Sequence, residues 1–251
     1  MQWYPPARAQ SLPEVLDTAF KLFSISLLKV LPYGMLGTLS GQLGNIYNLA
    51  TGRPLRQFLP RDVASWLVFG VSITLSVALW AALLLRQRAI SQGTPASMPV
   101  ELASVARRLP ELVGLVLLQL IAVGAGFAIL IIPGVYIFVA LSMAVPALVL
   151  ENLAPIDAMK LSLRLTKGNW WRTFGIFLVS LAIVFVFYAL GGIFAAIVAQ
   201  FEHGADVAVV TATSTVVVIS LGAVSAPFFA AVSLAVFGEL KTRAALVSAT
   251  G

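Results

Sequence analysis

The chain of 251 residues contains no cysteine, one histidine and few charged residues. The lack of cysteine excludes disulfides, iron–sulfur clusters and thiolate nucleophiles. A single histidine, His203, cannot build a multi-histidine metal site or a two-histidine zinc motif. Charged residues make up 10% of the sequence, against about 25% in an ordinary soluble domain. The composition therefore lacks the polar surface that a water-soluble protein needs, and it predicts neither a metal nor a cofactor.

The sequence instead contains long apolar segments without charged residues. A membrane-spanning helix needs about 20 apolar residues. Six uncharged segments approach or exceed this length, at residues 30–50, 63–85, 112–132, 134–150, 173–201 and 207–238. Pro133–Gly134 predicts a tight turn between the third and the fourth segment, and Pro227 predicts a kink in the sixth. The fold class is therefore predicted to be all-α, a polytopic membrane protein with six transmembrane helices in one integral membrane domain over residues 1–251.

The lysine and arginine residues fall mainly on one side of the predicted membrane. Thirteen of the 16 lie in the amino-terminal segment, the 86–110 and 151–172 loops and the carboxyl-terminal tail. The opposite side holds only Arg53, Arg56 and Arg61. Because cytoplasmic loops carry an excess of positive charge, we expect both termini in the cytoplasm. The first span has no cleavage-like end, so we expect it to remain in the mature protein.

Three cytoplasmic segments share one pattern, in which a proline is followed by an acid and then by bases. They are Pro13–Phe23, Pro99–Leu109 and Pro155–Lys167. Proline suits the first turn of a helix, and an acid is favourable there. The pattern predicts three interfacial amphipathic helices, each followed by a transmembrane hairpin, in a pseudo-threefold repeat with units at about 11–85, 97–150 and 153–243. The alternative is that unrelated cytoplasmic loops each contain an ordinary amphipathic helix.

Enzyme motifs are missing from the sequence. It contains no G-x-S-x-G, no H-E-x-x-H and no phosphate-binding G-x-x-x-x-G-K-[ST]. Acids and bases, which mark proton and ion pathways in membranes, are absent from the centres of the six segments. We therefore expect no catalytic, cofactor-binding or metal-binding residues, and no carboxylate relay of a proton-coupled transporter.

Basic and aromatic side chains gather in the cytoplasmic loops and form the first group of candidate site residues. Arginine and lysine pair with phosphate, and tryptophan favours the membrane interface. These residues are predicted to contact anionic lipid headgroups, or to act only as interfacial anchors. The group consists of Arg107, Arg108, Lys160, Arg164, Lys167, Trp170, Trp171 and Arg172.

Polar residues within the spans form the second group, Gln42, Asn45, Asn48 and Gln119. They are predicted either to line a cavity or to hydrogen-bond between helices, which is the commoner use of such residues. The pair Gly37 and Gly41 has the spacing of a close helix contact. The external turn with Glu202, His203 and Asp206 is expected to be solvated.

Residues 131–177 carry a family resemblance. The pieces are I-P-G-V-Y, P-A-L-V-L-E-N and P-I-D-A-M-K-L-S-L-R-L-T-K-G-N-W-W-R, together with the earlier S-L-P-E-V-L-D-T-A-F-K-L-F. This combination resembles the bacterial family of YciC-like membrane proteins, related to the membrane domain of some glycerophosphodiester phosphodiesterases. The resemblance implies a six-helix protein of the bacterial inner membrane. It does not imply phosphodiesterase activity, which belongs to a separate soluble barrel of about 250 residues.

The sequence favours a non-enzymatic integral membrane protein that binds lipids or a protein partner in envelope maintenance. The alternative is a transporter or channel for a small or lipidic substrate. A third hypothesis, an enzyme acting on lipid, lacks the acid–base and nucleophile sets that it needs. Expected partners are membrane lipids, including anionic ones, and a partner protein or second copy, but not nucleic acid.

Overall fold

A computed structural model describes residues 5–6, 8–53, 60, 62–94, 97–201 and 207–250. Within these ranges all regular structure is helical. The helices are α1 (Leu12–Gly41), α2 (Leu43–Ala50), α3 (Val63–Gln92), α4 (Met98–Arg107), α5 (Leu109–Ile129), α6 (Ile131–Leu141), α7 (Ala144–Glu151), α8 (Pro155–Thr166), α9 (Trp170–Phe201) and α10 (Val207–Thr250). Six helical stretches, with α6 and α7 counted as one, are long and apolar enough to cross a membrane, which confirms the prediction of six spans.

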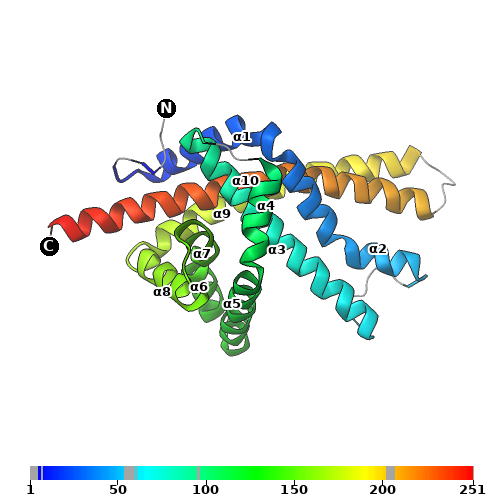
Figure 1. The fold of residues 1–251 in the computed structure, drawn as a ribbon. Helices are drawn as coiled ribbons and strands as arrows, with labels where there is room; N and C mark the ends of the chain where they lie inside the picture. Colours follow the sequence, from blue (N-terminus) through cyan, green and yellow to red (C-terminus); the bar gives the residue numbers. More distant parts are fainter. Residues whose placement is uncertain are drawn as a thin grey trace.

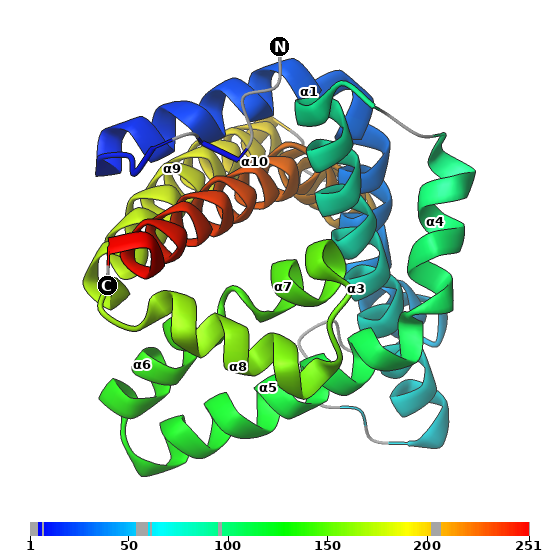
Figure 2. The ribbon, with the colours of Figure 1, turned by 60° about the vertical axis from the view of Figure 1, so that its left-hand side comes forward.

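The helix α10 is the central element of the fold. It packs most extensively against α1 and also against α9 and α3, while α5 packs against α6. All residues from 230 to 240 in α10 are buried, as expected for a helix that is apolar on every side. The helices α5 and α6 point away from α9 and α10 (Figure 1). Between these two pairs lie α2 and the amino-terminal end of α3. Figure 2 shows α4 alongside α3, and α8 lying across α5 and α6.

The first amphipathic segment differs from its prediction. Pro13–Phe23 is not a separate helix, because α1 continues from Leu12 to Gly41. No glycine or proline stands between Phe23 and Lys29 to end the helix. Pro32 lies inside α1. Because an internal proline bends a helix, it accounts for the bend of α1 along its length (Figure 1). The predicted span 30–50 is divided at Gln42, where α1 ends and α2 begins.

The turn predicted at Pro133–Gly134 lies three residues earlier, at Leu130. This residue is extended (φ −165°, ψ 160°) and separates α5 from α6. Pro133 is the third residue of α6, where its missing N–H has no intrahelical partner to lose. Pro146 has the same position in α7, and it explains why the fourth span is interrupted at Ser142 and Met143. A proline there cannot donate to the carbonyl four residues earlier.

Glycines allow a close contact between α1 and α10, but they are not the glycines that the sequence pattern predicts. A methyl group at Gly34 would clash with the carbonyl oxygen of Ala223, and one at Gly222 would clash with the side chain of Thr38. In contrast, among the described residues a methyl group at Gly37 would meet only the Cβ of Leu79, 3.9 Å away, and one at Gly41 would meet no atom within 4 Å. The spacing of Gly37 and Gly41 therefore marks no close approach in this structure.

Candidate functional site

An apolar cleft lies among the helices that are long enough to span a membrane. Its volume is about 950 Å³, at the upper end of the range of small-molecule sites, about 300–1,000 Å³. Each of α1, α3, α5, α6, α9 and α10 contributes to its wall, for example through Thr38, Trp80, Val123, Phe138, Leu181 and Phe229. The wall therefore combines segments that are up to about 190 residues apart in the sequence.

The polar groups on this wall are mostly engaged with the protein itself. Gln119 donates from Nε2 to the carbonyl oxygen of Leu141 at 2.8 Å, next to the interruption between α6 and α7. The hydroxyl of Thr38 donates to the carbonyl of Gly34 at 2.9 Å, and that of Ser142 to the carbonyl of Val139 at 2.7 Å. The cleft is thus suited to an apolar occupant.

The row Gln42, Asn45 and Asn48 does not line this cleft. Asn45 is exposed and donates to the side-chain oxygen of Gln42 at 2.7 Å, whereas Asn48 is buried. Of the four residues predicted to line a cavity or to pack between helices, Gln119 is the one that the structure places on the wall of the cleft.

Two buried polar clusters connect the helices beside the cleft. Gln87 of α3 is fully buried, and its Nε2 donates to the carbonyl of Pro227 at 2.8 Å and to the hydroxyl of Ser26 at 3.3 Å. Glu101 of α4 is also buried; it accepts a hydrogen bond from the hydroxyl of Tyr33 and pairs with Arg86 at 3.2 Å. These clusters join α1, α3, α4 and α10, and sequence reasoning missed them because their partners are remote in the chain.

A third buried cluster includes one of the predicted headgroup residues. Arg172 lies 3.4 Å from the carboxylate of Glu239, which also pairs with Arg243 and is 1% exposed. Both arginines donate to the carbonyl of Gln10, at 2.5 and 2.9 Å. The sequence signal for Glu239 was its spacing four residues before Arg243, which suits an ion pair along one helix.

Arg108 is likewise occupied by the protein. Its Nη1 donates to the carbonyl of Leu148 at 2.8 Å and to Asn152 Oδ1 at 2.9 Å, and its Nη2 donates to the carbonyl of Leu153 at 2.7 Å. A cation is favourable at the carboxyl end of a helix, where carbonyls lack intrahelical donors. Arg108 therefore caps α7 and holds it to the start of α5.

The remaining predicted headgroup residues lie on the surface. Arg107, Lys160, Arg164 and Lys167 are exposed, and Lys160 alone among them has a recorded ion partner within the described part of the chain, Asp157 at 3.6 Å. They are accessible to a ligand, unlike Arg108 and Arg172.

The two tryptophans take different positions. Trp170 stacks between Tyr136 and Phe174, with ring centroids 5.5 and 5.3 Å away, and donates from Nε1 to the carbonyl of Tyr136 at 3.1 Å. Trp171 is 78% exposed. Trp170 thus joins α9 to α6, and Trp171 is the one available to contact lipid.

The residues Glu202, His203 and Asp206 lie outside the described residues. Within the described ranges, no group of three or more histidine, aspartate or glutamate side chains is arranged to hold a metal ion.

The fold and the apolar helices define an integral membrane protein with several spans. A family model described as "Domain of unknown function (DUF7847)" matches residues 50–240, so the chain belongs to this family. No curated protein and no solved structure matches the chain. The family match gives no support to the YciC-like resemblance or to a relation with phosphodiesterases, and both stay predictions.

Proposed function

We propose that the protein binds membrane lipid without catalysing a reaction, and that the apolar cleft receives an acyl chain. The observation that carries this proposal is a cleft of about 950 Å³ among the spanning helices. Its wall is largely apolar, and polar groups such as the amide of Gln119 already have protein partners. Inside a bilayer the surrounding solvent is hydrocarbon, so an acyl chain is the occupant that this wall fits best.

The second part of the proposal is that exposed basic side chains contact the lipid headgroup. Arg164 and Lys167 point away from the buried face of α8, which contains Ala158, Ser162 and Leu165. A basic stripe beside a membrane attracts anionic headgroups. We assign headgroup contact to Arg107, Lys160, Arg164, Lys167 and Trp171. We also propose cytoplasmic termini, because most basic residues lie on that side, and a bacterial inner membrane, which the YciC-like resemblance implies. The proposed repeat has three units, and in the first of them the amphipathic segment is the start of α1.

The cleft is tested by filling it. Val123 lines the cleft on α5, whereas Val186 of α9 is 55% exposed and lies outside the cleft wall. We expect Val123→Trp to reduce the dioleoylglycerol bound to the detergent-solubilised protein, measured by native mass spectrometry. Val186→Trp adds the same volume at an outward position and is expected to leave binding unchanged. Equal binding by both variants would contradict a lipid site in the cleft.

A second candidate, transport of a lipidic substrate, is favoured by one observation. The fourth span is interrupted at Ser142 and Met143, and Ser142 lines the cleft. Interrupted helices commonly form substrate sites in transporters. Vesicles containing the protein and a fluorescent phospholipid distinguish the candidates. Faster loss of inner-leaflet fluorescence to an external quencher, abolished by Val123→Trp, indicates transport, whereas an unchanged rate with intact lipid binding indicates binding alone.

We further propose that the bound lipid, or a protein partner recognised with it, links the protein to maintenance of the cell envelope. Support for this role comes from the three predicted amphipathic segments beside the membrane and from the lack of enzyme motifs in the sequence. Purification in mild detergent with identification of bound lipids and subunits tests it, because a clean apo mass would remove the basis for a lipid role.

A further inference from the structure

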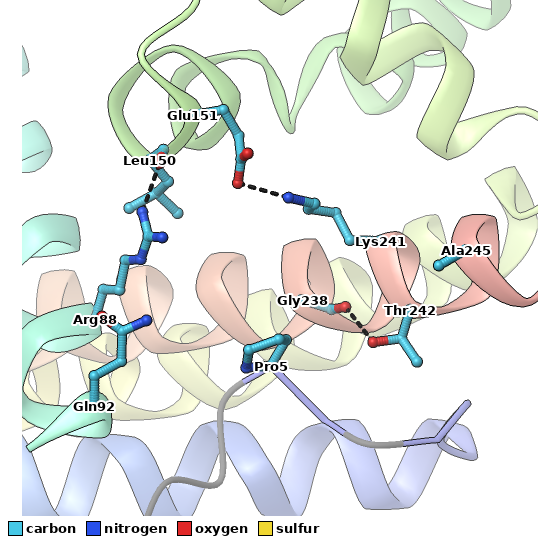
Figure 3. A pocket seen from close by; sticks show the side chains of 9 residues that line it. All are labelled: Pro5, Arg88, Gln92, Leu150, Glu151, Gly238, Lys241, Thr242 and Ala245. Carbon is cyan, nitrogen blue, oxygen red and sulfur yellow. Dashed lines mark hydrogen bonds and ion pairs between the residues drawn. The ribbon is translucent and has the colours of Figure 1, made fainter.

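A second, smaller pocket lies at the ends of α3 and α7, against α10. Its volume is about 240 Å³, and it shares no lining residue with the apolar cleft. Two cationic side chains, Arg88 and Lys241, line it together with the amide of Gln92, the hydroxyl of Thr242 and the carboxylate of Glu151. Figure 3 shows the guanidinium of Arg88 and the ammonium of Lys241 on opposite sides of one space. The proposed function does not use this pocket.

The guanidinium of Arg88 is held in place through Nη1, whereas its Nε has no acceptor within the described part of the chain. Its Nη1 donates to the carbonyl oxygen of Leu150 at 2.5 Å. Its Nε is buried and has no hydrogen-bond partner among the described residues. Buried donors in proteins are normally satisfied, so an orphaned one requires an explanation. The Nε and Nη2 edge is the planar fork with which arginine binds two oxygens of one anion.

Lys241 brings a second positive charge that a ligand can recruit. Its Nζ pairs with Glu151 Oε1 at 2.7 Å, and their side chains are 43% and 30% exposed. Such partly exposed pairs contribute little stability, so an anion can displace Glu151 from Lys241. Thr242 donates to the carbonyl of Pro6 at 2.9 Å, which places the amino-terminal segment beside the pocket (Figure 3).

We propose that this pocket binds a phosphate ester, with two of its oxygens on the Nε and Nη2 fork of Arg88 and a third on Lys241. The pocket carries two positive charges and one negative charge, so it favours an anion. The phosphate belongs either to a lipid headgroup or to a soluble compound. Both sources present the same tetrahedral oxygens, and binding measurements separate them.

The test compares three probes on the full chain in detergent: inorganic phosphate, dioleoylphosphatidylglycerol and dioleoylglycerol. The two lipids carry the same acyl chains, and only the first carries phosphate. Arg88→Lys keeps the charge and removes the fork, and Lys241→Gln removes the second charge. Lys29→Gln removes an equivalent charge from an exposed position on α1, at a residue with no assigned role in lipid binding. Loss of a charge-assisted hydrogen bond weakens binding by about tenfold or more.

We expect both pocket variants to bind phosphatidylglycerol about tenfold more weakly. Their binding of dioleoylglycerol, and the binding of both lipids by the Lys29→Gln control, should stay unchanged. Glu151→Gln is expected to strengthen binding, since it removes the competing carboxylate from Lys241. A merely structural ion pair predicts no such gain. If inorganic phosphate competes with phosphatidylglycerol for the pocket, a soluble phosphate compound is identified as a source. If it does not compete, the lipid headgroup is identified as the source.

The proposal is overturned if phosphatidylglycerol and dioleoylglycerol bind equally well. It is also overturned if Arg88→Lys and Lys241→Gln leave the binding of phosphatidylglycerol and of inorganic phosphate intact. Either result leaves the apolar cleft unaffected, because Val123→Trp tests that site with a phosphate-free lipid. The Lys241→Gln variant covers the case in which a change at Arg88 prevents folding, since Lys241 lies on the exposed side of α10.

Discussion

The amide nitrogen of Gln87 lies 2.8 Å from the carbonyl oxygen of Pro227, a contact between residues 140 positions apart. Pro227 lies inside α10, and Gln87 is fully buried on α3. The same amide reaches Ser26 on α1 at 3.3 Å. One side chain therefore ties together the three helices that form the centre of the fold.

Replacement of Gln87 by leucine is expected to destabilise the protein. Interhelical hydrogen bonds in membrane proteins contribute about 0.6 kcal/mol on average and at most about 1.7 kcal/mol. Because this amide has two partners, we expect a loss near the upper value, measured as a shift in the unfolding transition in mixed detergent micelles. Asn45→Leu is the control, since Asn45 is exposed and its side chain bonds to the nearby Gln42. Equal stability of the two variants would show that the Gln87 contacts are not structural.

Gly34 and Gly37 are three residues apart on α1 and predict opposite results on substitution by alanine. The added methyl at Gly34 would clash with the backbone of Ala223, whereas at Gly37 the nearest atom lies 3.9 Å away. Overpacking costs about 1–3 kcal/mol. We expect Gly34→Ala to lower stability by that amount, and Gly37→Ala to be neutral or to gain about 0.5 kcal/mol from helix propensity. Thermal unfolding of the two variants in the same detergent compares them directly.

The contrast between these glycines shows which part of the fold the sequence predicts. Segment length and hydropathy are local properties, and they predicted the six spans. The residues on which two helices meet depend on which helix becomes the neighbour, and hydropathy does not encode that choice. The spacing of Gly37 and Gly41 is therefore recognisable in the sequence, but the fold makes no close helix contact there. No local sequence pattern marks Gly34 and Gly222, at which α1 and α10 do meet.

The candidate site divides in the same way. Exposed bases such as Arg164 and Lys167 could be named from charge and helical spacing alone. Arg108 and Arg172 are also bases that flank the apolar segments, yet the fold uses them to cap α7 and to pair with Glu239. The apolar cleft was invisible, because its wall is assembled from six helices and each contributes ordinary apolar residues.

Asp62 is predicted to fix the start of α3 in a pH-dependent manner. Its carboxylate accepts from the backbone N–H of Ser65 at 2.7 Å and pairs with Arg53 at 2.5 Å. The Ser65 backbone hydrogen bond and, after it, Arg53 lower the pKa of Asp62 from its ordinary value of 3.8 to about 2. A lowered pKa means that the stabilisation is fully present above pH 3.8 and is lost as the pH falls through about 2.

Hydrogen exchange of the first amides of α3 checks this behaviour. In the wild type, protection should be constant above pH 3.8, decline as the pH falls below that value, and reach its lowest level near pH 2. Asp62→Asn should lower the protection at neutral pH and remove its dependence on acid. Identical profiles for the two proteins would rule out a capping role for the charge.

Reversal of charge at Arg164 and Lys167 is predicted to weaken retention of anionic lipid. Each base near an anionic surface contributes about 1 kcal/mol, so loss of both predicts a decrease of about thirtyfold in affinity. Native mass spectrometry of the Arg164→Glu, Lys167→Glu double variant with added dioleoylphosphatidylglycerol measures it. Lys29→Glu, an exposed base on α1, is the control for net charge. Undiminished retention would reduce the stripe on α8 to a topology signal.

Glu239 is predicted to hold the amino-terminal segment against α9 and α10. Its buried carboxylate pairs with Arg172 and Arg243, and both arginines donate to the carbonyl of Gln10. Removal of one partner from a buried ion pair costs about 3–5 kcal/mol, because the remaining charge loses its counter-ion. Both arginine side chains are partly exposed, at 21% and 31%, so we expect Glu239→Gln to fall near the lower end of that range.

The same variant should release the chain before α1. Without Glu239 the guanidinium groups are free to turn toward water, and the carbonyl of Gln10 loses its donors. Hydrogen exchange around residues 8–11 should therefore rise in Glu239→Gln while the middle of α5 stays protected. Asp157→Asn is the control, because Asp157 is 61% exposed and its ion pair with Lys160 is on the surface. Global loss of protection in Glu239→Gln would instead show that this cluster supports the whole fold.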